Sequence, residues 1–503
     1  MVNPINRRSF LKTATTLTLG TYASRALGFP NSSKKPNLLF IWTDQQRYDT
    51  LAVYGNKQIK MPNLNKLATE SVVFKNTYVT QPVCTPSRGS VMTGLWPHQN
   101  GLLSNNMHLS RETKCFPEII NESGYSTGYL GKWHLGDELW KQHGFDEWIS
   151  IEDNYINYYS PGRDRSQRST YDAFLTRKGY KHNNKKKDIF SRPYVSTLPF
   201  EDSKPKYLEI QAVDFLERHK NDSFILYVNF LEPHTPVNGP FNDMYNPDEL
   251  DRNPNVDCAL AENDPLLYRN RAENYKKKMR DWKNTNAKYF GLCSEIDMAV
   301  GGILAKLERL GLSDNTIVVF TSDHGDMMGS HGLFDKSVMY SEAIRVPWLV
   351  RWPELSPKQI VVTQNVSHID LVPTLLELLG KQKPNELPGK SLVPLIRGQV
   401  KDNGDVFVEW NAGPAGDDDE EGFKKNGTED DNVSKTANIR TIVTQDRWKL
   451  CLSDCDKSQL FNLNDDPGEC KNLYYDENHR DVIEKLRKRI LDWQNSVNDT
   501  VSI

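Results

Sequence analysis

The 503-residue chain lacks several features that would place it in a special class of protein. No apolar run reaches the roughly 18 residues that a membrane span needs, so the sequence predicts no transmembrane helix. Lysine and arginine total 63 and aspartate and glutamate total 66, which gives a formal net charge of -3. This balance lacks the basic excess typical of nucleic-acid-binding proteins, and we expect no nucleic-acid partner. No internal repeat is evident, so nothing supports a repeat architecture.

The chain has few cysteines, and their number is odd. The seven are Cys84, Cys115, Cys258, Cys293, Cys451, Cys455 and Cys470. An oxidising compartment would permit disulfides, but an odd count leaves one cysteine over. Because Cys451, Cys455 and Cys470 lie close together in the sequence, we expect one bridge among these three. Buried free thiols are the alternative.

The N-terminus carries a pattern of its own. Arg7-Arg8-Ser9-Phe10-Leu11-Lys12 precedes a mildly apolar stretch, and small residues follow around Ala23, Ala26 and Gly28. This pattern resembles a twin-arginine export signal, with a basic, flexible tail as the alternative. We therefore expect a signal peptide over residues 1–28 and a linker over 29–36. The export machinery would be a partner, and the mature protein would be periplasmic or secreted.

Three short apolar runs have the composition of strands that are buried on both faces of a sheet. They are residues 37–42, 224–230 and 316–320, followed respectively by Asp44, by Glu232-Pro233-His234 and by Asp323-His324-Gly325. A helical pattern of apolar residues between Ile296 and Leu310 precedes the third run and ends at Gly311. Ligands of open α/β sheets bind beyond the carboxyl ends of the strands. The pattern therefore predicts an α/β domain with a polar site at one sheet edge.

The remaining segments are less regular. Residues 163–193 hold ten lysines and arginines against three acids, which predicts either a basic lip for a polyanionic substrate or a solvated insertion. The acidic runs at 417–421 and 429–431 predict a loop. After it, residues 440–450 and 459–463 predict short strands, and 481–496 predict a helix that covers them. We expect a main domain over 37–400 and a smaller one over 401–503.

The segment Cys84-Thr85-Pro86-Ser87-Arg88-Gly89 resembles the Cys-x-Pro-x-Arg signature of type I sulfatases, whose cysteine is oxidised to formylglycine. Residues 124–134, which read GYSTGYLGKWH, are similar to the second signature of that family. The resemblance extends from about Asn37 to the turn at 466–469. It implies an alkaline phosphatase-like α/β fold, with a large mixed sheet between helices and a smaller C-terminal α+β domain on a short antiparallel sheet. It also implies a formylglycine-generating or sulfatase-maturating enzyme as a partner.

The chemistry of a sulfate monoester agrees with this resemblance. The hydrated aldehyde of formylglycine supplies two geminal hydroxyls on one carbon. One attacks sulfur and forms a covalent sulfo-enzyme; the other then loses its proton and expels sulfate as the aldehyde reforms. Without this modification, Cys84 would be a buried thiol or a disulfide partner of Cys115. The resemblance implies that Arg88 orients the hydroxyls, and a surface ion pair is its alternative role.

The resemblance also implies a site for one divalent metal. Asp44, Gln45, Asp323 and His324 match the ligand positions, and the modified Cys84 would add an oxygen. The ion would lower the pKa of the nucleophile and neutralise charge on the sulfate. Oxygen ligands favour calcium or magnesium, and the resemblance points to calcium. The commonest family pattern has a second aspartate and an asparagine where this chain has Gln45 and His324.

Four further residues match the remaining site positions of the family: Lys132, His134, His234 and Lys336. The resemblance implies that the two lysines hold the sulfate oxygens and stabilise developing charge. His234 would protonate the leaving oxygen as a general acid. His134 would take the proton from the second hydroxyl during sulfate release.

The sequence thus predicts an exported sulfatase that acts on sulfated polysaccharides or oligosaccharides, such as ulvan, algal galactans or glycosaminoglycans. One alternative is a phosphonate monoester or phosphodiester hydrolase of the same superfamily, since such relatives share the formylglycine. An alternative of another class is a non-catalytic relative that binds sulfated glycans. That alternative predicts erosion of the catalytic residues, whereas every position of the set is filled.

Overall fold

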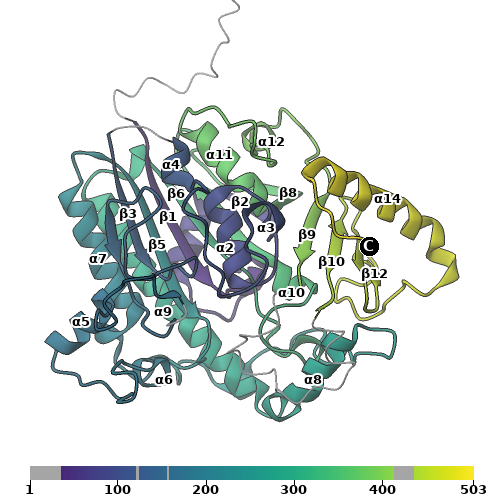
Figure 1. Ribbon diagram of the computed structural model, residues 1–503, viewed down its shortest axis with the longest axis horizontal. Coiled ribbons are helices and arrows are strands. Elements are labelled where there is room, and N and C mark those ends of the chain that lie inside the picture. Colours follow the sequence, from purple (N-terminus) through teal and green to yellow (C-terminus); the bar gives the residue numbers. More distant parts are fainter. Residues whose placement is uncertain (1–34, 121–123, 156–157, 413–435) are drawn as a thin grey trace, which may run out of the picture. The chain divides into compact units, whose positions relative to one another are not determined.

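The computed structural model describes residues 35–120, 124–155, 158–412 and 436–503 (Figure 1). The predicted signal peptide, nearly all of the predicted linker and the predicted acidic loop at 417–421 and 429–431 lie outside the described residues. Among the helices that are described, none is long and apolar enough to cross a bilayer.

A mixed sheet of eight strands forms the larger part of the fold, in the order β4-β3-β5-β1-β6-β7-β2-β8. The strands are β1 (Asn37–Asp44), β2 (Val72–Tyr78), β3 (Tyr125–Gly131), β4 (Glu147–Ile149), β5 (Ser223–Pro233), β6 (Thr316–Ser322), β7 (Arg345–Arg351) and β8 (Ile360–Ser367). Strand β7 runs antiparallel to its neighbours β6 and β2, and all other pairs are parallel. Every residue of β1 is buried, as its continuous apolar sequence predicts.

Helices cover the sheet on both faces. The α-helices described before residue 400 are α1 (Pro62–Thr69), α2 (Cys84–Thr93), α3 (Pro97–Asn100), α4 (Phe116–Ile120), α5 (Thr170–Arg177), α6 (Arg192–Val195), α7 (Lys204–Arg218), α8 (Leu266–Met279), α9 (Trp282–Arg309), α10 (Ser341–Ile344), α11 (Leu371–Leu378) and α12 (Val393–Ile396). Leu39 and Ile41 of β1 belong to one core with apolar residues of α7 and α9. Trp42, the residue after Ile41, faces the other way, where Arg88 of α2 lies over its ring at 4.9 Å. The predicted helix before β6 is confirmed, and Gly311 follows it with a φ of +65°.

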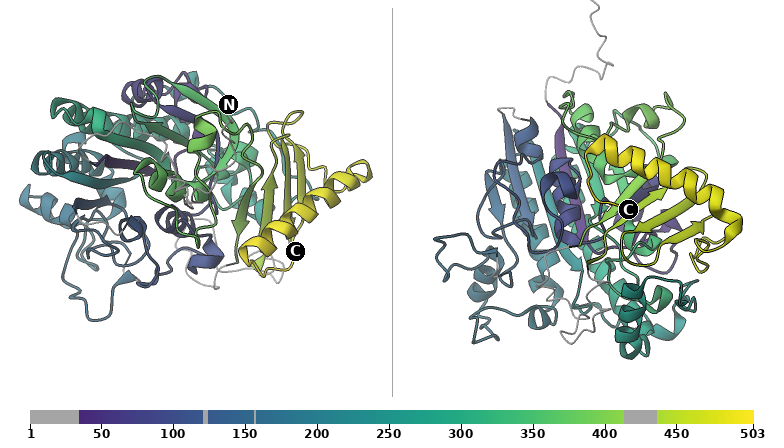
Figure 2. Two further views of the ribbon diagram at one scale, coloured as in Figure 1. Left: turned by 90° about the horizontal axis from the view of Figure 1, so that it is seen from above. Right: turned by 45° about the vertical axis from the view of Figure 1, so that its right-hand side comes forward.

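A second, antiparallel sheet has the strand order β12-β11-β10-β9. Its strands are β9 (Val406–Trp410), β10 (Ile439–Val443), β11 (Trp448–Ser453) and β12 (Gln459–Asn462). Helix α14 (Arg480–Val497), the long yellow helix in Figure 2, lies against this sheet. Its Leu486 and Ile490 pack against Ile442 and Leu450 of the sheet. The predicted fold class is therefore confirmed. The boundary near residue 400 stays a prediction.

The disulfide of the described chain joins Cys258 to Cys470, with a Cα–Cα distance of 5.2 Å. The predicted bridge among Cys451, Cys455 and Cys470 is therefore wrong. Cys451 is buried in β11 as part of an apolar core, and Cys455 is exposed and forms no disulfide. The loop between β5 and α8 returns to the turn after β12 and brings a cysteine 212 residues away against Cys470. Proximity along the sequence did not predict this pairing.

Candidate active site

The predicted polar site lies where four parallel strands end. Asp44 is the last residue of β1, Lys132 follows β3, His234 follows β5 and Asp323 follows β6. Because β3, β5, β1 and β6 are parallel neighbours, their carboxyl ends meet at one edge of the sheet. All four side chains are buried there.

Close backbone approach at this edge requires glycine at the end of β3. Gly131 has a φ of +116°, and a Cβ atom there would lie 1.8 Å from the carbonyl oxygen of Asn229. The chain then turns, and His134 adopts a left-handed φ of 58°. Glu138 secures this turn, because its carboxylate accepts the backbone N–H groups of Trp133 (2.9 Å) and His134 (2.7 Å). The second signature motif therefore supplies turn geometry as well as side chains.

Cys84 is the first residue of α2 and is 1% exposed. Its Sγ lies 3.1 Å from Nε2 of His324 and 3.8 Å from Oδ1 of Asp44. Cys84 and Cys115 are both free, so they form no disulfide with each other. The thiol sits at the N-terminal end of a helix, where the helix dipole favours negative charge.

Cys84 belongs to a buried cluster with Asp44, Asp323 and His324, whose ligand atoms all lie within 4.8 Å of one another. Arg88 holds the two carboxylates from outside. Its Nη2 donates to Oδ2 of Asp44 (2.9 Å), and its Nε donates to Oδ2 of Asp323 (2.8 Å). The Oδ1 atoms of both acids face Nε2 of His324, at 3.8 and 3.7 Å.

The orientation of His324 suits a metal ligand. Its Nδ1 donates to the carbonyl oxygen of Gly325 (2.9 Å), which turns Nε2 toward the two acids. Burial alone would lower the pKa of His324, but Asp323 and Cys84 raise it to about 9. Burial alone would raise the pKa of Asp44, but Lys132, His234 and Arg88 lower it well below its usual value. Two carboxylates and an imidazole that converge in a buried site fit a divalent cation.

Gln45 lies between this cluster and Lys336. Its backbone N–H donates to Oδ1 of Asp323 (3.0 Å), and its side-chain Oε1 accepts from Nζ of Lys336 (2.9 Å). Its Nε2 donates to Asp326 (2.5 Å) and Asp335 (3.1 Å), and these two acids decide which end of the amide faces the site. The sequence predicted no role for Asp326 or Asp335. Their only signal in the sequence is proximity, since Asp326 lies two residues after His324 and Asp335 directly precedes Lys336.

His234 and Lys336 form a hydrogen-bonded pair. Nδ1 of His234 donates to the carbonyl oxygen of Thr235 (2.8 Å), so Nε2 is the acceptor for Nζ of Lys336 at 3.2 Å. Burial and the charge of Lys336 lower the pKa of His234 well below its usual value. A neutral imidazole thus accepts a hydrogen bond from a buried ammonium group.

Lys132 and His134 occupy the other side of the site. Nζ of Lys132 donates to Oδ2 of Asp44 at 2.6 Å. The ring of His134 stacks on Tyr155 with 4.3 Å between ring centroids, and burial together with Lys132 lowers its pKa well below the usual value. Arg192 lies over the same tyrosine ring at 5.0 Å and pairs with Glu152 at 2.9 Å. The sequence analysis gave no site role to Tyr155.

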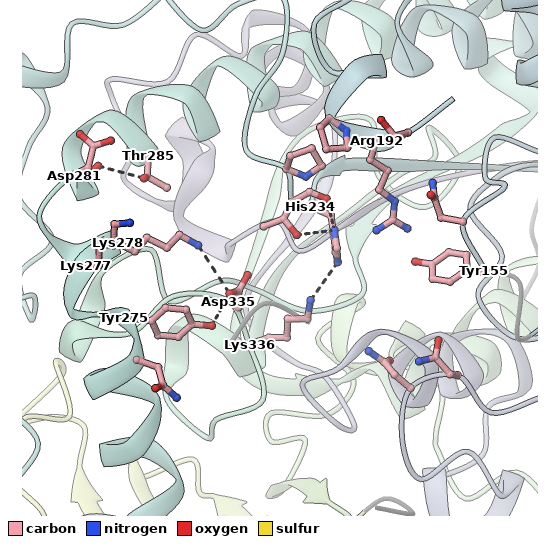
Figure 3. Close-up of a pocket in the computed structure, with 18 of the residues that line it drawn as sticks. Tyr155, Arg192, His234, Tyr275, Lys277, Lys278, Asp281, Thr285, Asp335 and Lys336 are labelled. Carbon is pink, nitrogen blue, oxygen red and sulfur yellow. Dashed lines mark hydrogen bonds and ion pairs between the residues drawn. The ribbon is translucent and has the colours of Figure 1, made fainter. Parts of the chain in front are cut away.

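A cavity of about 1340 Å³ opens over His134, His234 and Lys336 (Figure 3). The end of α8 forms one wall, and the opposite wall includes Tyr155 and Arg192. The structure thus brings together all ten predicted site residues. Of the predicted basic lip, Lys187 and Arg192 line this cavity, whereas the neighbouring Lys185 and Lys186 do not.

Comparison with known proteins identifies the family. A family model described as Sulfatase matches residues 36–381. The chain is 31% identical over 480 residues to an arylsulfatase from Clostridium perfringens, covering 91% of this chain and 94% of that protein. It is 32% identical over 376 residues to an ulvan-active sulfatase from Formosa agariphila, covering 72% and 65% respectively.

The fold also matches a solved structure. A phosphonate monoester hydrolase from Silicibacter pomeroyi superposes with a TM-score of 0.76 at 22% identity, covering 92% of this chain and 95% of that one. At this identity the match establishes the fold and nothing finer. The family model and the sequence identities decide the class of reaction: the chain belongs to the sulfatase family and is a sulfuric ester hydrolase with an alkaline phosphatase-like fold.

Proposed function

We propose that this protein is an exported, formylglycine-dependent sulfatase that hydrolyses sulfate monoesters on sulfated polysaccharides or oligosaccharides. The observation that carries the proposal is the position of Cys84. Its Sγ lies in a buried cluster with Asp44, Asp323 and His324, below a cavity lined by His134, His234 and Lys336. The export part rests on the sequence of residues 7–28 alone.

Oxidation of Cys84 requires access to its thiol. The folded chain leaves Cys84 only 1% exposed, so a formylglycine-generating or sulfatase-maturating enzyme must act before the chain folds. A twin-arginine route, which carries folded proteins, would export the enzyme after this step. Once hydrated, the formylglycine would supply two geminal hydroxyls. One would be the nucleophile, and the other would expel sulfate from the covalent intermediate.

The buried cluster fits a divalent cation, and calcium is the ion that we propose, with magnesium as the alternative. Asp44, Asp323 and His324 would hold it, together with Gln45 and the modified Cys84. When bound, the cation would neutralise negative charge on the sulfate and favour the ionised nucleophile. Arg88 keeps the two carboxylates in place from outside the cluster and would orient the modified side chain.

The remaining residues bind the sulfate and move protons. Lys132 and Lys336 place two buried ammonium groups on either side of the site, where they would hold sulfate oxygens. His234 would protonate the leaving oxygen from Nε2 as the general acid, after taking that proton from the ammonium group of Lys336 at 3.2 Å, which would be left as a neutral amine. The lowered pKa of His134 keeps its imidazole neutral, which suits a group that accepts a proton during sulfate release.

Sulfated glycans are the substrate class that we favour. One relative is an ulvan-active sulfatase, and the cavity is large enough for sugar rings beyond the sulfate. The rival phosphonate activity is supported only by likeness of fold to two phosphonate monoester hydrolases, each 22% identical to this chain. The non-catalytic rival predicts loss of site residues, whereas this chain keeps all ten.

The test is release of inorganic sulfate from a panel of sulfated polysaccharides, their oligosaccharides and 4-nitrophenyl sulfate. The enzyme is produced with a formylglycine-generating partner, and Cys84→Ala serves as the inactive control. We expect release from at least one substrate by the wild type and none by the variant. If converted enzyme releases no sulfate but cleaves a phosphonate ester, the phosphonate alternative holds. If it cleaves neither, the sulfatase proposal fails.

A further inference from the structure

The cavity above the site carries more positive charge than one sulfate group requires. Its lining includes four cations at the end of α8 and just beyond it: Lys276, Lys277, Lys278 and Arg280. The sequence analysis did not single them out. A run of lysines in the last turn of a helix is commonly explained by the helix dipole, so each needs a separate account of its partners.

Two of these four cations are neutralised by neighbours. Lys276 pairs with Glu273 one turn earlier on α8. Lys278 lies 3.9 Å from Oδ2 of Asp335 and over the ring of Phe334 at 4.4 Å. These contacts give both side chains a structural role. Their presence is therefore explained without a bound ligand.

Lys277 and Arg280 differ from that pair. Both are exposed, and neither side chain has an ion pair or hydrogen bond within the part of the chain that the structure describes. The acid nearest to them in the sequence, Asp281, instead accepts a hydrogen bond from Asn284. Two uncompensated cations on one cavity wall repel each other, and an anion bound between them would relieve that repulsion.

This wall is fixed relative to the sulfate-binding residues. Oη of Tyr275 in α8 donates to Oδ2 of Asp335 (2.6 Å), and Asp335 is the neighbour of Lys336 in the sequence. Oδ1 of Asp335 accepts from Nε2 of Gln45 at 3.1 Å. Figure 3 shows Tyr275, Asp335 and Lys336 in succession between the α8 wall and His234. A group bound at the wall is therefore held at a set distance from the sulfate that is cleaved.

From these contacts we infer that Lys277 and Arg280 form a subsite for a second anionic group of the substrate, a sulfate ester or a carboxylate on the same glycan. This inference rests on the proposed sulfatase function and narrows it to substrates with at least two anionic groups. Lys187 lies in the lining outside α8 and adds to the same positive field. Neutral sugars with a single sulfate engage only the residues around Cys84.

The first test compares two substrates of the converted enzyme. The double variant Lys277→Gln/Arg280→Gln is measured on 4-nitrophenyl sulfate and on the sulfated oligosaccharide that the wild type cleaves best in the panel. We expect KM for the oligosaccharide to rise by at least about tenfold with kcat little changed, and kcat/KM for 4-nitrophenyl sulfate to stay the same. The matched control is Lys185→Gln/Lys186→Gln, which removes two charges of the basic segment outside the cavity. Equal losses on both substrates, or no loss on either, would overturn the inference.

A binding measurement keeps the inference testable without turnover. Dextran sulfate oligosaccharides are titrated into the Cys84→Ala protein by calorimetry, with and without each double substitution. We expect the Lys277/Arg280 change to weaken binding by at least about tenfold and the Lys185/Lys186 change to weaken it much less. If both weaken it equally, the α8 cations are only part of a diffuse positive surface. Failure of the wild type to release sulfate from any substrate would instead contradict the proposed function and leave this comparison of affinities intact.

Discussion

Two fully buried arginines show how differently this protein uses the same kind of ion pair. Arg440, in the small sheet, binds both carboxylate oxygens of Asp499 at 2.5 and 2.9 Å. Its remaining N–H groups donate to Oδ1 of Asn411 and to the carbonyl oxygens of Trp410 and Ile439. One cation therefore faces one anion, and all five donors of the guanidinium are used.

Arg88, at the edge of the large sheet, binds only one oxygen of each of two carboxylates. The other oxygens of Asp44 and Asp323 face His324 and Cys84, and Lys132 brings a further buried charge to Asp44. The first cluster, which we call the closed cluster, pairs the charges of Arg440 and Asp499 with each other, as a structural ion pair does. The second, which we call the open cluster, leaves one oxygen of each carboxylate facing His324 and Cys84, and Gln45 links it to Lys336 in the lining of the cavity. This arrangement is expected where a cation and an anionic substrate complete the charge balance.

The largest effect of a single substitution is expected at the open cluster of Arg88, Asp44 and Asp323. Asp323→Asn removes a carboxylate that faces the cation site, while keeping the shape of the side chain. We expect kcat for sulfate release to fall by at least about 10³-fold, because a preorganised electrostatic contact to the reacting groups is lost. Initial rates measure this loss. Cooperative thermal unfolding of the variant is the control, and near-wild-type turnover would contradict the role assigned to Asp323.

The corresponding change at the closed cluster should affect stability and leave catalysis unchanged. Asp499→Asn leaves the guanidinium of Arg440 buried without its anion, which costs about 3 kcal/mol of unfolding free energy or more. Urea unfolding measures this loss, and turnover per folded molecule at 25 °C should equal that of the wild type. A variant that is as stable as the wild type, or one that is folded but inactive, would contradict the claim that the closed cluster serves stability and not catalysis.

Removal of the proposed metal ion tests the same distinction without altering the protein. Chelation should lower the unfolding free energy of the wild type by about 2–3 kcal/mol if calcium had been present at about 100 times its dissociation constant. Calorimetry with and without chelator measures the shift. Asp323→Asn should show little shift and Asp499→Asn a full one. A shift of equal size in all three proteins would place the cation elsewhere.

The smallest expected effect is a pH dependence beside the closed cluster. His98 binds Glu409 (2.6 Å) and the carbonyl oxygen of Val497 (3.1 Å); burial lowers its pKa, but the bond to Glu409 gives a net rise. A raised pKa stabilises the fold fully below the unfolded value of about 6.5, and this contribution is lost as the pH rises through the folded value. The stability difference between the wild type and His98→Gln should therefore shrink by about 1 kcal/mol from acid to alkaline pH. Urea unfolding at several pH values measures it, and a difference that grows with pH would contradict the assignment.

Local patterns in the sequence predicted the parts of this fold that local physics controls. Continuous apolar runs predicted β1, β5 and β6, and the polar residues just after them predicted the edge that holds Asp44, His234 and Asp323. Two signature motifs, matched to a family by resemblance, supplied Cys84 and Lys132. The structure places these side chains within reach of one another, as the parallel order of the strands requires.

Contacts between distant segments could not be predicted in this way. The Cys258–Cys470 bridge spans 212 residues, and no local pattern indicates that pairing. Asp335 orients Gln45 across 290 residues, so its role is visible only in the folded chain. Nothing in the sequence pointed to the cations at the end of α8, and only their place in the cavity lining suggests a role for Lys277 and Arg280.

The central claim is that Cys84 acts as formylglycine, and its most direct test relates modification to rate. Preparations with different extents of conversion are made by varying the maturating enzyme. Mass spectrometry of the peptide that contains Cys84 gives the fraction of aldehyde in each preparation, and sulfate release gives the rate. The account predicts a rate proportional to that fraction, with no turnover by the pure thiol form. Full activity from protein whose Cys84 is entirely unmodified would contradict it.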